Sequence, residues 1–157
     1  MLKLISPLTQ VDSTTAQFTV GSKTITANGN EYIYLPGTDS VAQYNWVAYR
    51  TSAAGPSYGS VTRMTQATSG PVGIAQGAIT SNKYGWFGIS GVFIGLCGSA
   101  TAAGGTVYAS GTAAAVNNEF VAGQNIFGAI STDIGKASSG GTGTFILSQP
   151  FQIGVAV

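Results

Sequence analysis

Side chains that could perform catalysis are few in this chain, and their spacing matches no catalytic motif. The sequence contains no histidine, which removes the commonest general base, the Ser-His-Asp and Cys-His arrangements and histidine-based zinc sites. Serine is abundant, but a serine without an activating base is a weak nucleophile. Gly141-Thr-Gly143 leads into an expected strand, and Lys136 precedes Ala137 where a P-loop needs Ser or Thr. The sequence therefore argues against hydrolases of the triad type and against nucleotide binding.

Five carboxylates remain as candidates for acid–base chemistry, namely Asp12, Glu31, Asp39, Glu119 and Asp133. A glycosidase needs two carboxylates on opposite sides of a sugar, and Glu31, Asp39 and Glu119 are the residues to test for that activity. Each carboxylate is flanked by turn or loop residues, and no loop contains the several acids that calcium prefers. We therefore expect solvated turn residues, no metal, no cofactor and no enzymatic activity, with a two-carboxylate glycosidase as an alternative.

Charged residues are scarce throughout the chain. They make up 7% of the 157 residues, with a formal net charge of +1, whereas about 25% is usual in soluble domains. Surfaces near neutrality promote association, so we expect uncharged polar side chains on the surface, burial against partners, or both. The six lysines and arginines are scattered, whereas nucleic-acid binding needs clustered cations. This pattern predicts no nucleic-acid partner and no polybasic membrane anchor, and no apolar run reaches the roughly 18 residues of a membrane span.

Cys97 is the single cysteine, so the chain cannot form an intrachain disulfide. It lies in an apolar run, where a free cysteine usually behaves as a small buried hydrophobe. Small secreted domains depend on disulfides, and the apolar N-terminal stretch is too short for a secretory signal. These features favour synthesis in the cytoplasm.

Strand signals are short and numerous, and no window shows the apolar periodicity of a helix. The segment Tyr84–Cys97 is apolar at both alternating positions and is interrupted by several glycines. It exceeds the usual 3–10 residues of a strand, so we expect its glycines to mark bulges or sharp bends. The sequence predicts an all-β fold, an antiparallel β-barrel or sandwich of about ten strands. Residues 1–14 are predicted as an extended N-terminal arm and residues 15–157 as a single β domain.

Local patterns give further expectations. Asn28-Gly29 predicts a hairpin with a type I′ turn, and Phe18 and Val20 alternate like strand residues. In Gln43–Arg50, Tyr44 and Trp46 are expected on one face of a strand and Val47 and Tyr49 on the other. Further strands are expected at 125–131, 144–148 and 151–157, the last two separated by Pro150.

Aromatic residues are the best candidates for contacts with partners, because Trp and Tyr are enriched at interface hot spots. Tyr44, Trp46, Tyr84 and Trp86 are the candidates, with packing in the core as the alternative for each. The apolar residues of the arm, Leu2, Leu4 and Ile5, are candidate contacts with a neighbouring subunit. The same aromatics could instead stack on sugars, so a carbohydrate- or receptor-binding β-module is an alternative.

Residues 31–157 carry motifs that resemble the decoration (cement) proteins of tailed bacteriophage capsids. The motifs are Tyr34-Leu-Pro-Gly37, residues 41–47, residues 73–92 with their G-x-A-Q-x-A and N-x-Y-G-W patterns, and residues 106–113. The resemblance implies a non-enzymatic virion structural protein on the outer capsid surface, a homotrimer or another small oligomer, that binds the major capsid protein and stabilises the shell. It implies no catalytic residues, and it leaves a minor capsid, head-fibre or tail component open.

Overall fold

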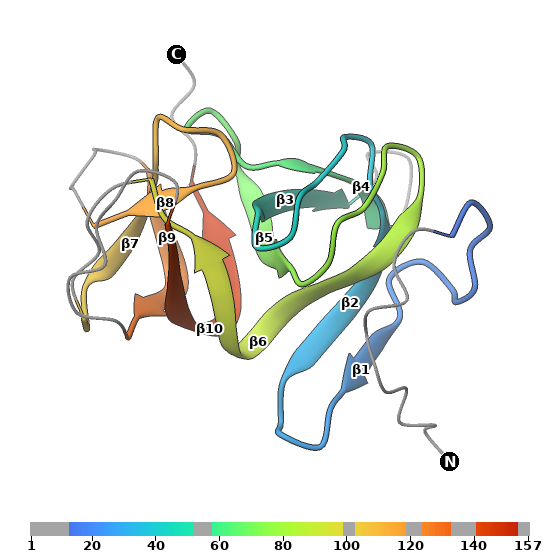
Figure 1. Ribbon diagram of the computed structural model, residues 1–157, viewed down its shortest axis with the longest axis horizontal. Coiled ribbons are helices and arrows are strands. Elements are labelled where there is room, and N and C mark those ends of the chain that lie inside the picture. Colours follow the sequence, from blue (N-terminus) through green and yellow to red (C-terminus); the bar gives the residue numbers. More distant parts are fainter. Residues whose placement is uncertain (1–12, 52–57, 99–102, 119–123, 133–140, 154–157) are drawn as a thin grey trace.

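The computed structural model describes residues 13–51, 58–98, 103–118, 124–132 and 141–153 (Figure 1). Within these ranges the protein is all-β and contains ten strands. The strands are β1 (Lys23–Ile25), β2 (Glu31–Pro36), β3 (Trp46–Thr51), β4 (Tyr58–Arg63), β5 (Gly70–Ala75), β6 (Tyr84–Leu96), β7 (Thr106–Ala109), β8 (Val116–Asn117), β9 (Asn125–Ser131) and β10 (Thr142–Gln152). The all-β prediction of about ten strands is confirmed. No helix of the described segments is long and apolar enough to cross a membrane.

The strands form one continuous sheet that folds over on itself. Its order is β1-β2-β6-β5-β10-β9-β7-β8, with β3 pairing with β5 and with β4, and β6 pairing also with β10. All ladders between these strands are antiparallel. The order ends at β1 and β8 and does not close, so the fold is the predicted sandwich and the barrel alternative is wrong.

The long strand β6 connects the two halves of the molecule, because its two ends pair with different neighbours. Its first part pairs with β2 and β5, and its second part pairs with β10. In Figure 1, β6 runs from β2 at the right to the group of β7, β9 and β10 at the left. Opposite β2, Ser90 faces Glu31 and Gly88 faces Tyr32, which leaves an extra residue in β6. The prediction that glycines mark an irregularity in this strand is confirmed.

Asn30 and Gly91 hold the bend of β6. Gly91 has a φ of 114°, a conformation that L side chains rarely adopt. The Asn30 side chain makes the two hydrogen bonds that the backbone of a neighbouring strand would otherwise make with Val92. Its Nδ2 donates to the Val92 carbonyl at 2.9 Å, and its Oδ1 accepts from the Val92 amide at 3.0 Å. Burial raises the pKa of the neighbouring Tyr32 phenol, and a hydrogen bond with Asn30 opposes that rise.

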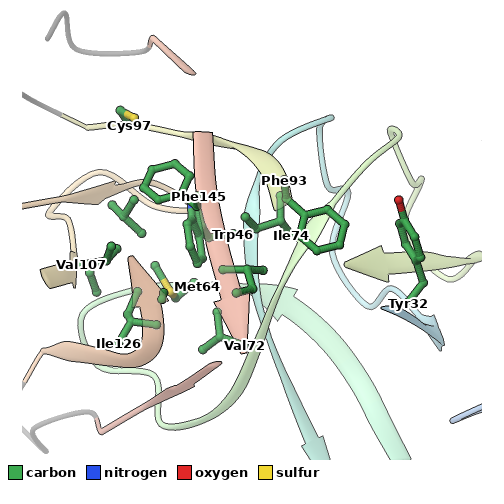
Figure 2. Close-up of a cluster of buried hydrophobic side chains, with 14 of the residues drawn as sticks. Tyr32, Trp46, Met64, Val72, Ile74, Phe93, Cys97, Val107, Ile126 and Phe145 are labelled. Atoms are coloured by element: carbon green, nitrogen blue, oxygen red, sulfur yellow. The ribbon is translucent and has the colours of Figure 1, made fainter. Parts of the chain in front are cut away.

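Two hydrophobic cores lie on opposite faces of the sheet around β2. Tyr32 and Tyr34 point into the large core, whereas Ile33 and Leu35 point into the small core. The large core is lined by every strand except β1 and β4, and Figure 2 shows Trp46 among its labelled side chains. The small core contains Ile33, Leu35, Val41, Val47, Tyr49, Val61, Ala75, Ile79, Phe87 and Ile89. Because β2 is buried on both faces, it is apolar at nearly every position.

Most local predictions are confirmed. The strand at 125–131 forms with the predicted bounds, and Cys97 is buried. Trp46 faces the large core, and Val47 and Tyr49 face the small core, as the alternation predicted. The prediction for Tyr44 is wrong, because Tyr44 lies before β3 and its φ of 70° is not that of a strand residue.

Three further local predictions are corrected. The hairpin between β1 and β2 forms, but only Gly29 of the Asn28-Gly29 pair has a positive φ, 84°. The Gly29 amide donates to the Thr26 carbonyl at 2.9 Å, so the turn is of the type I plus glycine-bulge kind, because type I′ needs two positive φ angles. Phe18 and Val20 lie outside any strand. Pro150 does not separate two strands; it lies within β10, next to Gln149 with a φ of 45°, where a bulge tolerates proline.

Candidate interaction surface

The second part of β6, together with β10 and β9, presents apolar side chains on both of its faces. Along β6, Phe93 is buried in the large core, whereas Val92 and Ile94 on the other face are 54% and 42% exposed. Along β10, Phe145 and Leu147 are buried, and Ile146 between them is 45% exposed. Residues that alternate along a strand point to opposite faces. The outer face of this part of the sheet is therefore lined by large aliphatic side chains.

Strand register brings these outer side chains into rows. Ile146 in the middle strand pairs with Val92 of β6 on one side and with Ile130 of β9 on the other. Further along β9 and β10, Phe127 of β9 pairs with Phe151 of β10. We call this surface the apolar face; it consists of Val92, Ile94, Phe127, Ile130, Ile146, Phe151 and Ile153, each between 42% and 54% exposed. Large apolar side chains in adjacent rows are more often found in interfaces than on free surfaces.

Charged side chains are absent from the described strands that form the apolar face. The described residues between Tyr84 and Ile153 include no lysine, arginine, aspartate or glutamate. Hydroxyl side chains border the apolar rows, and all except the half-buried Thr144 are exposed: Thr106, Thr132, Thr142, Thr144 and Ser148. The Gln76 side chain donates to the Ile94 carbonyl at 3.4 Å, and Glu31 pairs with Ser90 near Val92. This arrangement, an apolar centre with a mainly hydroxyl rim, has the anatomy of a protein–protein interface.

The two tryptophans predicted as candidate contacts lie inside the molecule. Trp46 is fully buried, and its ring meets Phe145 edge-on with centroids 5.0 Å apart. Trp86 is 4% exposed and contacts Tyr34 at a centroid distance of 5.1 Å. Their role as exposed contact residues is therefore corrected to core packing, because these large side chains bury the most apolar area when they face inward.

The two tyrosine candidates are half-buried. Tyr84 stacks on Tyr34 with ring centroids 5.9 Å apart. Tyr44 has a φ of 70°, and its carbonyl accepts a hydrogen bond from the Leu96 amide at 2.8 Å. The structure does not bring either of them to the apolar face, so their contact with a partner stays a prediction.

The segment before β1 covers the start of β6. The Ser13 carbonyl accepts a hydrogen bond from the Tyr84 amide at 3.1 Å, and the Gln17 amide donates to the Tyr34 hydroxyl at 3.1 Å. The Phe18 ring lies 5.2 Å from both Tyr34 and Trp86. Ser13, inside the predicted arm of residues 1–14, is thus attached to the sheet. Leu2, Leu4 and Ile5 lie outside the described residues.

Removal of the Phe18 ring is expected to expose Trp86. Phe18→Ala should lower the free energy of unfolding by about 2 kcal/mol, because a half-buried aromatic ring and its contacts are lost. The tryptophan fluorescence of the folded variant should shift to longer wavelength, since water reaches Trp86 while Trp46 stays buried. Urea unfolding followed by fluorescence measures both effects. Ile25→Ala, at a position 57% exposed, is the control and should change stability by less than about 0.5 kcal/mol; equal losses in the two variants would contradict the covering role of Phe18.

Side chains with acid–base chemistry are not gathered in the described part of the chain. Glu31 begins β2 and Asp39 lies in the turn after it, whereas Asp12, Glu119 and Asp133 lie outside the described residues. Within the described segments, no three His, Cys, Asp or Glu side chains lie together as metal ligands would. A hollow of about 310 Å³ is lined by uncharged residues: Thr65, Gln66, Ala67, Ser110, Gly111, Ala113 and Gln124. These groups offer hydrogen bonds but no proton transfer.

Comparison with known proteins gives one informative likeness. No protein-family model matches the chain, and no curated protein is similar to it. Among solved structures, the fold is similar to that of the N base of the head fiber gp8.5 in bacteriophage phi29, with a TM-score of 0.54 and 10% sequence identity. The match covers 80% of this chain and 98% of the phage chain. At this identity the likeness shows a shared fold.

Proposed function

We propose that this chain is a non-enzymatic structural protein of a bacteriophage virion that sits on the outer surface of the head. In this proposal it binds the major capsid protein, stabilises the shell as a decoration protein, and acts as a homotrimer. The observation that carries the proposal is the fold, which matches a head-fiber base over nearly the whole of that chain. The resemblance of residues 31–157 to decoration proteins supports the same location independently.

The chemistry of the described residues is consistent with a role in assembly. The apolar face and its hydroxyl rim offer contact area without charge. Repetition of modest contacts over a lattice gives strong total retention, because each further contact is made at high effective concentration. A protein of this kind works through buried area and needs no acid–base pair.

The base of a head fibre is a second candidate, and the phi29 likeness favours it specifically. In this second proposal the chain anchors a projection that contacts receptors or carbohydrate, and it occupies selected positions of the head. In the first proposal it occupies every equivalent position of the lattice. The two candidates therefore differ in copy number and in their effect on the shell.

Head binding and head stability test the proposal together. Heads of the phage that encodes this chain, prepared without the protein, would be incubated with the purified chain and examined by cryo-electron microscopy. A decoration protein should bind the outer surface at full lattice occupancy and raise the temperature at which the heads release DNA. A fibre base should bind at a few positions and leave that temperature unchanged. Absence of binding to these heads would overturn both candidates.

A further inference from the structure

We propose that the apolar face is the surface through which copies of this chain associate. The inference rests on the self-association in the proposed function and assigns it to particular strands, namely the second part of β6 with β10 and β9. The occupant is a second copy of this chain, and in a trimer three such faces turn inward toward the symmetry axis.

The exposed apolar area of this face supports association. Its apolar side chains are between 42% and 54% exposed, and together they leave on the order of 600 Å² of apolar surface in water, judged from typical side-chain areas. The largest apolar patch of an ordinary monomer is about 300–600 Å². A standard interface takes about 800 Å² from each partner, of which about 65% is apolar in a homo-oligomer, so the apolar face is large enough to form the apolar part of such an interface.

The lack of charged side chains on these strands favours a copy of the same chain as the partner. In a homo-oligomer each charged group meets surfaces that carry the same groups, and like charges brought together are unfavourable. The described residues of β6, β7, β9 and β10 include no ionisable side chain except the Tyr84 and Tyr108 phenols. Association of this face with itself therefore brings no like charges of these described strands together and desolvates no ion that they carry. Homo-oligomer interfaces are also the most apolar class, with about 65% apolar area.

Strand geometry supports the same occupant. The row Val92, Ile146 and Ile130 crosses three adjacent strands in register, and β-branched side chains on a sheet surface interdigitate with those of a second sheet about 10 Å away. Ile25, the remaining highly exposed large hydrophobic of the described residues, is on β1, which ends the sheet order and pairs with none of β6, β9 and β10. It provides a matched control for the test.

The test compares three proteins by native mass spectrometry and analytical ultracentrifugation over a range of concentrations: the wild-type chain, Ile146→Lys and Ile25→Lys. We expect the wild type and Ile25→Lys to be trimers. We expect Ile146→Lys to dissociate to monomers, with an apparent dissociation constant raised about 100-fold or more, because each copy would bury an unpaired ammonium group. Circular dichroism checks that each variant is folded, and Ile130→Lys replaces Ile146→Lys if that variant does not fold.

The outcomes of this experiment test the association surface separately from the proposed role in the virion. A folded Ile146→Lys or Ile130→Lys that remains a trimer would show that the copies meet elsewhere and would overturn the inference. A monomeric wild type would also overturn it, while head binding by that monomer would leave the virion role standing. A wild-type trimer that dissociates on Ile146→Lys but does not bind heads would support the inference and remove the virion role.

Discussion

Gly91→Ala is expected to lower the free energy of unfolding by about 3–5 kcal/mol, a large share of the stability of a small domain. Gly91 has a φ of 114°, which alanine adopts only with strain. An added Cβ would also lie 2.2 Å from Asn30 Oδ1 and 2.9 Å from the Asn30 Cα. To relieve this overlap, Asn30 would have to give up both of its hydrogen bonds to Val92. Buried groups left without partners cost about 1–3 kcal/mol.

Gly29→Ala separates these two contributions. Gly29 has a positive φ of 84°, and an added Cβ there would meet nothing within 4 Å. That variant should lose only the cost of backbone strain, about 1–2 kcal/mol. Urea unfolding followed by circular dichroism, with equal slopes for both variants, measures the difference. If Gly91→Ala and Gly29→Ala lost the same free energy, Asn30 would have no part in holding the bend.

Local signals made the central strand predictable. The apolar residues of Tyr84–Leu96 and the glycines among them are neighbours in sequence, so both the strand and its irregularity could be inferred from the chain alone. The hairpin at Gly29 and the strand Asn125–Ser131 follow from similarly local patterns. The type of turn was missed because Asn-Gly pairs also fit a type I turn that is followed by a glycine bulge.

The pairing of strands that are distant in the chain could not be predicted from the sequence. β10 lies between β5 and β6 on one side and β9 on the other, and no pattern in the chain states which strands are adjacent. The continuity of β10 through Pro150 depends on the positive φ of Gln149. That conformation is imposed by the pairing of the strand before and after the bulge, and it is uncommon for residues other than glycine.

The apolar face was missed for a related reason. Strands that are apolar at both alternating positions do not reveal which set faces the core. In residues 92–94 all three side chains are large and apolar, yet only Phe93 is buried. The continuously apolar strands were themselves the signal that this part of the sheet carries apolar side chains on both faces. Attention to tryptophan as an interface residue led instead to Trp46 and Trp86, which are in the core.

Gly88→Ala is expected to lower the free energy of unfolding by about 3 kcal/mol, the upper end for overpacking. The Phe93 ring folds back onto Gly88, and an added Cβ would lie 2.3 Å from Phe93 Cε1. Phe93 is 2% exposed and meets Tyr32 edge-on at 5.4 Å, so its ring has no free space. Gly88 pairs with Tyr32 and Ile74 of the two adjacent strands, so the backbone is also held in place.

A double-mutant cycle with Phe93→Leu identifies the ring as the obstacle. In the Phe93→Leu background the added methyl group of Gly88→Ala meets a smaller, flexible side chain, and its further cost should fall below about 1 kcal/mol. Gly111→Ala is the control, because the nearest atom to its Cβ would be Gln66 Nε2 at 4.0 Å, and its stability should change by less than about 1 kcal/mol. Additive losses in the cycle would contradict the assigned contact. Coupling between these two positions would show that the bend of β6 is held by the packing of one part of the strand on another as well as by its hydrogen bonds.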